Sequence, residues 1–209
     1  AIHSFCHCLP NTWHLMSVML SCTSNINWFN STFESTIEEI TNGLSSFIGE
    51  KKYIGNAPYY LPYLTGERTP INDPHARASF HQIGIGNDRK SLIYALFEGV
   101  SFGLNDNYQS LCKTGIQLKN IYAIGGGSKN EHWLKLLASI FNRDLAITNA
   151  SDAMAAFGAA RIAHIGYHNL NPSEALSPPE IINTVKKNND YSDILQERFQ
   201  NWKNFYIRN

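Results

Sequence analysis

The hydrophobic and polar positions along this chain follow two periods, one typical of helices and one of short strands. Apolar residues at helical spacing predict helices over residues 35–47, 91–111, about 153–164 and about 194–206. Short apolar runs predict an early hairpin that leads into a helix, and strands at residues 121–124 and 145–147. Strands and helices that alternate after a hairpin indicate an α/β domain with a mixed sheet flanked by helices.

The longest apolar stripe lies in the helix predicted over residues 91–111. Its buried face would hold Ile93, Leu96, Phe97, Val100, Leu104, Tyr108 and Leu111. Glu98, Asn105 and Gln109 would lie away from that face. Gly99 and Gly103 stand four residues apart on the same helix, which indicates that another element packs closely against it.

A glycine-rich turn joins a predicted strand to a predicted helix in IYAIGGGSKNEHWLKLLASIFN, residues 121–142. Gly125, Gly126 and Gly127 end the apolar run, and a helical pattern begins a few residues later. Because glycine has no Cβ, a flat ligand can lie against this backbone. The following helix N-terminus offers free N–H groups and a partial positive charge. The pattern favours a nucleotide, and a turn that only reverses the chain fits it equally well.

Two common nucleotide motifs do not fit this turn. Gly125-x-Gly127-x-x-Asn130 lacks the third glycine of the dinucleotide fingerprint, and the P-loop spacing occurs nowhere in the chain. A nucleotide bound here therefore implies a different fold.

The first residues, AIHSFCHCL, bring histidine and cysteine close together in the sequence. In a strand, side chains alternate between faces, so Cys6 and Cys8 would share one face while His3 and His7 share the other. The Cys-x-Cys spacing also differs from that of zinc sites, where two residues separate the cysteines. We therefore expect no metal site in the chain.

A loop rich in proline and charge follows a predicted strand in YYLPYLTGERTPINDPHARASFHQ, residues 59–82. Prolines restrict the chain and lower the entropic cost of holding a loop in one shape, as a site-forming loop requires. Two interpretations of Glu67, Arg68, Asp73 and Arg77 remain open. These side chains pair among themselves to fix the loop, or they contact a ligand or another domain.

Composition and charge narrow the class of partner. The 209 residues are 43% hydrophobic, and 17 basic residues balance 17 acidic ones, so nothing favours nucleic acid or a membrane surface. No apolar run approaches the ~20 residues of a membrane span. Four cysteines without a framework spacing indicate free thiols in the cytoplasm. We expect small-molecule partners and, because the chain begins with Ala1 rather than Met, a fragment of a longer protein.

Three blocks of the sequence resemble the C-terminal region of the FGGY family of carbohydrate kinases. They are HSFCHCLPNTWHLMSVMLS, the loop LPYLTGERTPINDP, and IGGGSKNEHWLKLLA followed by FGAARIA. The likeness covers nearly all of residues 1 to about 165. Within the family, the TGERTP loop with the WHLMSVML block favours kinases of D-xylulose over those of glycerol or gluconate.

The resemblance implies an actin-like ATPase fold of the ribonuclease-H-like type, in which two domains enclose a cleft. Residues 1–209 would form the C-terminal nucleotide-binding domain, without its first hairpin and without the N-terminal sugar-binding domain. By analogy, Gly126, Gly127 and Asn130 would line the adenine and ribose pocket, with Gly125 and Ser128 beside them. The small-residue helix around residues 156–160 would back this pocket.

The resemblance also implies that this chain alone is inactive and holds no catalytic residue. In the family, the general-base aspartate and the hairpin that holds the ATP phosphates precede the matched region. We expect ATP and Mg²⁺ as cofactors, D-xylulose as substrate, the N-terminal domain as partner, and a homodimer as one candidate assembly. The alternatives are another ketose or polyol kinase of the family, or a non-catalytic actin-like nucleotide-binding module.

Two positions depart from the family pattern. Gln82 stands where the family usually has a glycine after the TGERTP loop, and Met154-Ala155 replaces a glycine-proline step before the FGAARIA helix. Both bear on the local shape of the pocket, and neither changes the family that the chain resembles.

Overall fold

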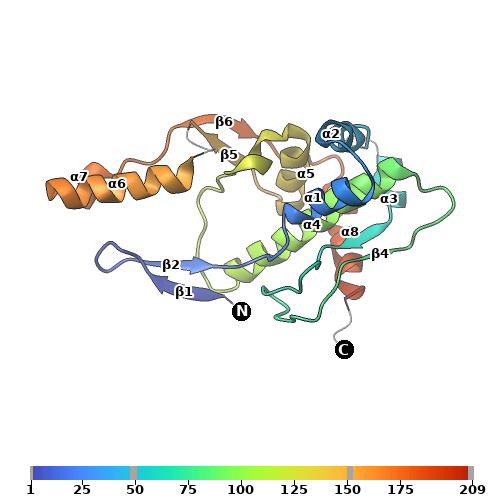
Figure 1. Ribbon diagram of the computed structural model, residues 1–209, viewed down its shortest axis with the longest axis horizontal. Helices are drawn as coiled ribbons and strands as arrows, with labels where there is room; N and C mark the ends of the chain where they lie inside the picture. The colour runs from blue at the N-terminus through green and yellow to red at the C-terminus, as the bar shows by residue number, and fades with distance from the viewer. Residues whose placement is uncertain (1, 48–50, 150–152, 207–209) are drawn as a thin grey trace.

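A long helix, α4 (Arg89–Cys112), runs through the centre of the molecule (Figure 1). The computed structural model describes residues 2–47, 51–149 and 153–206. The elements that pack against α4 are β3 (Tyr59–Leu61), α1 (Ser24–Thr32), α2 (Ile37–Ser45), α5 (Glu131–Phe141) and α8 (Ser192–Asn204). The main core therefore surrounds this one helix.

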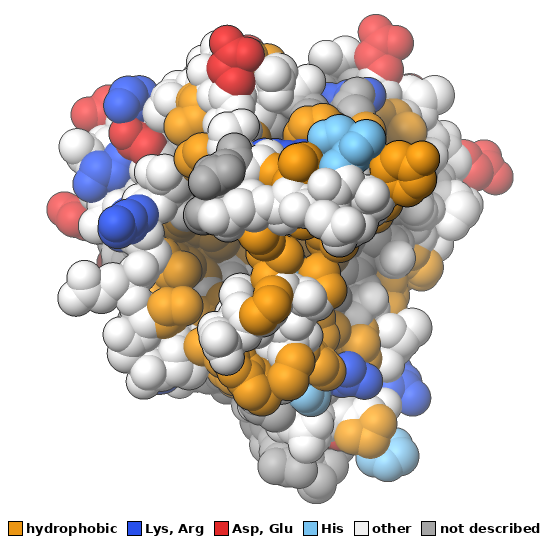
Figure 2. Space-filling view, turned by 90° about the vertical axis from the view of Figure 1, so that its left-hand side faces the viewer, with side chains coloured by type: hydrophobic (Ala, Val, Ile, Leu, Met, Phe, Trp, Pro, Cys, Tyr) orange, Lys and Arg blue, Asp and Glu red, His pale blue; other side chains and the backbone are white. Residues whose placement is uncertain are grey.

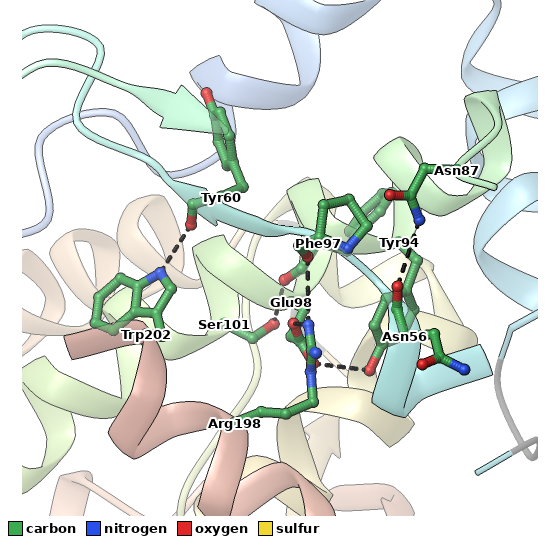
Figure 3. A network of polar contacts seen from close by, with 10 residues as sticks. Asn56, Tyr60, Asn87, Tyr94, Phe97, Glu98, Ser101, Arg198 and Trp202 are labelled. Atoms are coloured by element: carbon green, nitrogen blue, oxygen red, sulfur yellow. Dashed lines mark hydrogen bonds and ion pairs between the residues drawn. The ribbon is translucent and has the colours of Figure 1, made fainter. Parts of the chain in front are cut away.

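The middle of α4 is buried on every side, which corrects the prediction of a single buried stripe. Glu98 and Asn105, expected away from the core, are 1% and 2% exposed. Arg198 of α8 donates two hydrogen bonds to the Glu98 carboxylate, at 2.7 Å and 2.6 Å (Figure 3). Because a buried carboxylate is tolerated only when it is paired and hydrogen-bonded, α8 is what permits a glutamate inside this helix bundle.

The two glycines of α4 mark close contacts with other elements, as their spacing predicted. A Cβ on Gly99 would lie 2.1 Å from the carbonyl oxygen of Tyr60 in β3. A Cβ on Gly103 would lie 2.9 Å from the terminal methyl carbon of Met19. The backbone of β3 can cross α4 at this depth only because no side chain stands in its way.

The described strands form three separate antiparallel pairs. The pairs are β1 (His3–Cys6) with β2 (Trp13–Met16), β3 with β4 (Ser79–His81), and β5 (Leu145–Thr148) with β6 (Ile181–Val185). The predicted hairpin, β1 with β2, is confirmed. The sequence pattern predicted neither β4 nor β6.

The run predicted as a strand at residues 121–124 makes one parallel bridge, between Tyr122 and Ala146 of β5. Two backbone hydrogen bonds support the bridge, from Ala123 N to Ala146 O at 2.9 Å and from Ala146 N to Ile121 O at 2.8 Å. Since β5 is antiparallel to β6, parallel and antiparallel pairing meet in this small group. The mixed parallel and antiparallel pairing is thus confined to these three segments. The run at residues 121–124 continues directly into the glycine turn.

The remaining helices are short or lie at one end of the molecule. They are α3 (Lys51–Asn56), α6 (Met154–His168) and α7 (Pro172–Ala175). The predicted helix over residues 35–47 is confirmed as α2, where Thr36 and Glu39 form a capping box. Among the described residues, no helix is long and apolar enough to cross a membrane.

Hydrogen bonds made by charged side chains hold the proline-rich loop between β3 and β4. The Glu67 carboxylate accepts a hydrogen bond from Leu20 N at 3.0 Å, and the Asp73 carboxylate accepts one from the Tyr206 hydroxyl at 2.5 Å. Arg77 donates to two backbone carbonyl oxygens. Among the residues that the structure describes, no ion pair joins the four charged side chains of this loop, but the Glu67 carboxylate accepts a hydrogen bond from Arg68 N at 2.7 Å. Glu67 and Asp73 also exchange two backbone hydrogen bonds, so pairing within the loop is by hydrogen bonds, and contact with a ligand or another domain stays a prediction.

Candidate nucleotide site

The glycine turn enters α5 through a short 3-10 helix, η1 (Gly126–Lys129). The carbonyl oxygen of Gly125 accepts hydrogen bonds from the backbone N–H of Ser128 at 3.1 Å and from its hydroxyl at 2.7 Å. The Oδ1 atom of Asn130 accepts a hydrogen bond from Trp133 N at 3.0 Å and so caps α5. One of the free N–H groups expected at this helix end is therefore used internally.

The three glycines have three different surroundings. Gly125 adopts a φ of 81°, a left-handed conformation that favours glycine. A Cβ on Gly126 would meet no atom within 4 Å, so this residue faces open space. A Cβ on Gly127 would lie 2.7 Å from Cζ3 of Trp133, which leaves no room for a side chain.

A hollow of about 550 Å³ separates the turn from α1 and α2, and we call it the α1–α2 hollow. Gly126, Gly127 and Asn130 line one side of it. Asn27 of α1 and Thr41 of α2 lie among the residues of the other side. Apolar side chains supply most of the remaining lining: Ile26, Ile37, Ile40, Phe97 and Trp133. Apolar walls with a few amide and hydroxyl groups are typical of pockets for planar ligands.

A second hollow of about 450 Å³ lies behind the turn, between α4 and α5, and we call it the α4–α5 hollow. Gly125 and Ser128 line it, together with mostly apolar side chains and Cys22. Burial raises the pKa of the Cys22 thiol to about 11; the Thr23 backbone N–H lowers it, and the Glu67 carboxylate raises it. The thiol is therefore neutral at physiological pH, and this hollow carries little charge.

The structure gathers all five predicted site residues around one turn, but it divides them between the two hollows. Gly126 and Gly127 line both, Asn130 lines only the α1–α2 hollow, and Gly125 and Ser128 line only the α4–α5 hollow. The sequence analysis missed the opposite wall, to which Thr23, Asn27 and Thr41 belong. No local signal marked these residues, because they come from elements about a hundred positions earlier that meet the turn only after folding.

The small-residue helix does not back the glycine turn, which corrects that prediction. Figure 1 shows α6 and α7 extending from one end of the molecule, and the described residues of α6 line neither hollow. A Cβ on Gly158 would meet no atom within 4 Å, and the Phe157 side chain remains 45% exposed. Alanine and glycine bury little apolar area, so these residues provide little hydrophobic driving force toward the turn.

The described residues contain no group of three or more His, Cys, Asp or Glu side chains that could hold a metal ion. In the hairpin, Phe5 lies opposite His14 and Cys6 lies opposite Trp13. In β1, Cys6 therefore lies on the face opposite to His3, while beyond the strand the Cys8 Sγ atom lies 3.5 Å from Nδ1 of His7. No Asp or Glu lies among the described lining residues of either hollow.

The model of the FGGY family of carbohydrate kinases, C-terminal domain, matches residues 1–167. The chain belongs to this family. The xylulose kinase of Escherichia coli (strain K12) is 36% identical to this FGGY chain over 178 residues, which cover 84% of the chain and 35% of that enzyme. The xylulose kinase of Staphylococcus xylosus is 34% identical over 176 residues, which cover 84% of the chain and 36% of that enzyme.

A solved structure shows the same fold. A xylulose kinase from Brucella ovis matches 99% of this FGGY chain and 42% of its own chain, with a TM-score of 0.90 and 34% sequence identity. The α/β class and the actin-like, ribonuclease-H-like architecture predicted from the sequence are thus confirmed. The chain spans about a third of the length of the curated relatives named above.

Proposed function

We propose that this chain is the nucleotide-binding half of an ATP-dependent kinase that phosphorylates D-xylulose to D-xylulose 5-phosphate. The α1–α2 hollow carries the proposal, because the bare backbone of Gly126 and Gly127 forms one wall of a slot whose other wall comes from α1 and α2. Glycine lets a flat base approach the main chain closely. The sugar is inferred from relatives named xylulose kinases, which are 27% to 37% identical to the chain.

The lining of the hollow suits the adenine and ribose of ATP. Ile40 and Phe97 offer apolar surface to the base, while the amide groups of Asn27 and Asn130 offer hydrogen-bond donors and acceptors. Lys129 also lines the hollow, and the described lining holds no carboxylate. A negatively charged phosphate chain therefore meets no repulsion at this wall.

Magnesium is proposed to accompany the ATP phosphates. Mg²⁺ in nucleotide sites is usually held by one or two carboxylates together with phosphate oxygens, and it neutralises charge on the phosphates when bound. The described part of the chain offers no cluster of three acidic or histidine ligands. These residues therefore do not form a metal site of their own.

We further propose that the complete polypeptide carries the missing half of the site upstream of Ala1. That half would contain the N-terminal sugar-binding domain, the general-base aspartate and the first hairpin of the present domain. Figure 2 views the side of the molecule from which both α6 and the β1–β2 hairpin extend, and it shows hydrophobic side chains gathered around a hollow on this face. Large exposed apolar areas of this kind mark surfaces that other segments cover. The cytoplasm, where ATP is abundant, is the proposed location.

A second candidate is another ketose or polyol kinase of the FGGY family. A gluconate kinase from Lactobacillus acidophilus has a TM-score of 0.71 and 26% identity to the chain, so the same domain architecture occurs with another named sugar. A third candidate, a non-catalytic actin-like module, would bind nucleotide without transferring phosphate.

The proposal is tested on the complete polypeptide with MgATP and a panel of D-xylulose, D-ribulose, D-gluconate and glycerol. We expect the highest kcat/KM with D-xylulose. Gly126→Val should abolish ATP binding because the side chain enters the slot, while folding is retained because a Cβ here meets no atom within 4 Å. Gly166→Val, at an equally open position in α6, is the matched control.

Three results would contradict parts of this proposal. Equal rates with all four compounds would reject the assignment of the sugar. ATP binding without phosphate transfer would favour the non-catalytic module. Unchanged ATP affinity in Gly126→Val would show that the glycines serve only to turn the chain.

A further inference from the structure

One side chain, Trp133, ties the glycine turn to the centre of the molecule. It stands in the first turn of α5 and is 5% exposed. Its indole Nε1 donates a hydrogen bond to Ser101 Oγ of α4 at 2.9 Å, and Ser101 donates in turn to the carbonyl oxygen of Phe97 at 2.7 Å. The indole also packs edge-on against the Phe97 ring, with centroids 5.4 Å apart. The ring therefore has both a polar and an apolar anchor on the buried helix.

The outer edge of the same ring lies directly under the turn. Its Cζ3 atom is 2.7 Å from the place that a Cβ of Gly127 would occupy, so the backbone of the turn rests on the indole. The backbone N–H of Trp133 donates to Asn130 Oδ1, which fixes the end of the turn. The position of the turn thus follows from the position of the ring, and the ring is fixed by α4.

Trp133 also lies between the two hollows. The α1–α2 hollow and the α4–α5 hollow share four lining residues: Thr23, Gly126, Gly127 and Trp133. The turn and the indole are therefore the partition that keeps the hollows separate. If the ring moved, the turn could sink toward the mostly apolar α4–α5 hollow, and the slot on its other side would widen.

We propose that Trp133 is a positioning residue for the nucleotide. This inference rests on the proposed function, because the slot whose width Trp133 sets is the proposed adenine pocket. The indole holds the wall formed by Gly126 and Gly127 at the distance at which a planar base contacts it and the α1–α2 side together. Trp133 acts through the two glycines, and the hydrogen bond to Ser101 determines where it stands.

The test compares Trp133 with Trp202. Each donates one hydrogen bond from its indole N–H, and substitution by phenylalanine removes that bond. Trp202 donates its indole N–H to Tyr60 O at 2.7 Å and is 1% exposed, but it belongs to α8 and lines neither hollow (Figure 3). ADP affinity is measured by calorimetry on the complete polypeptide at a temperature where both variants are folded. Trp133→Phe should weaken ADP binding roughly tenfold, the equivalent of one net hydrogen bond with its packing. Trp202→Phe should lower the melting temperature and leave ADP affinity unchanged.

A double-variant cycle separates positioning from general destabilisation. Gly127→Ala should weaken ADP binding because its Cβ collides with the indole. In the double variant with Trp133→Phe, the smaller ring removes the collision, so ADP affinity should recover relative to Gly127→Ala alone. Strictly additive losses of ADP affinity in the double variant would overturn the inference while leaving the proposed function intact. Equal effects of Trp133→Phe and Trp202→Phe on ADP affinity would do the same. Failure of the unmodified protein to bind ADP would overturn the proposed function, and the inference with it.

Discussion

Gly125, Gly126 and Gly127 look alike in the sequence, but their surroundings in the structure differ. Backbone conformation favours glycine at 125 and contact with Trp133 favours it at 127, whereas a Cβ on Gly126 would meet no atom within 4 Å, so only the proposed nucleotide would require glycine there. At Gln82 the backbone adopts a φ of 59°, a left-handed geometry that costs a side-chain-bearing residue roughly 1–2 kcal/mol.

Cys22 provides a prediction at this scale. Because burial raises its pKa to about 11, only about one thiol in a thousand is ionised at pH 8, and the thiolate is the reactive form. We expect iodoacetamide to label the exposed Cys6 and Cys8 at pH 8 while Cys22 stays unlabelled, and the Cys22 rate to rise steeply as the pH approaches 11. Peptide mapping by mass spectrometry measures the rates. Labelling of Cys22 as fast as Cys6 at pH 8 would contradict the raised pKa.

At the scale of elements, the long periodic helices and the β1–β2 hairpin were predictable, whereas β4 and β6 were not. The helix predicted over residues 91–111 occupies 89–112, because Asp88 caps its start by accepting a hydrogen bond from Ser91 N at 2.9 Å. In contrast, β4 has three residues and β6 has five, and partners distant in sequence define both strands. The pairing of β4 and of β6 is a tertiary contact, so no local periodicity in the sequence predicts it.

The crossing of β3 over α4 gives a prediction at this scale. Gly99→Ala should destabilise the fold by about 3 kcal/mol, because its Cβ would lie 2.1 Å from the Tyr60 carbonyl oxygen, and β3 can yield only by moving its backbone. Gly103→Ala is the matched control: its Cβ would crowd only the flexible end of Met19 and would lie at an ordinary contact distance of 3.5 Å from the Pro62 ring, and alanine gains about 1 kcal/mol of helix propensity. Urea unfolding compares the two. Equal losses of unfolding free energy in the two variants would show that β3 does not pack tightly against α4.

At the scale of the whole molecule, α8 closes the domain by returning to α4 and β3. Arg198 hydrogen-bonds to Glu98 (Figure 3). It also donates to Pro58 O at 3.3 Å, and its guanidinium carbon lies 4.2 Å from the centroid of the Tyr59 ring. Burial lowers the pKa of Arg198, but the charge and hydrogen bonds of Glu98 raise it by more, so the guanidinium stays ionised. The family match ends at residue 167, yet α8, which lies beyond it, completes the core that surrounds α4.

Breaking this pair should unfold the domain more readily. Arg198→Met leaves the Glu98 carboxylate buried without its partner and should cost about 3–5 kcal/mol of unfolding free energy. Adding Glu98→Leu should recover much of that loss, because the uncompensated charge is gone. The exposed pair of Lys135 and Glu131 is the control, and Lys135→Met should leave stability nearly unchanged. Thermal unfolding of the three variants and the unmodified protein tests this; a double variant no more stable than Arg198→Met would show that packing, rather than charge, was lost.

The sequence by itself determined the fold class, the long helices and the glycine turn, because these depend on local periodicity and on the absence of a Cβ. It also carried the family blocks, since the TGERTP loop and the IGGG turn are contiguous in the chain. Only the tertiary structure decided that Glu98 is buried against Arg198, that α6 stands away from the turn, and that Asn27 and Thr41 face Gly126. Each of these depends on which distant segments meet, and periodicity records the face a residue occupies but not the partner across from it.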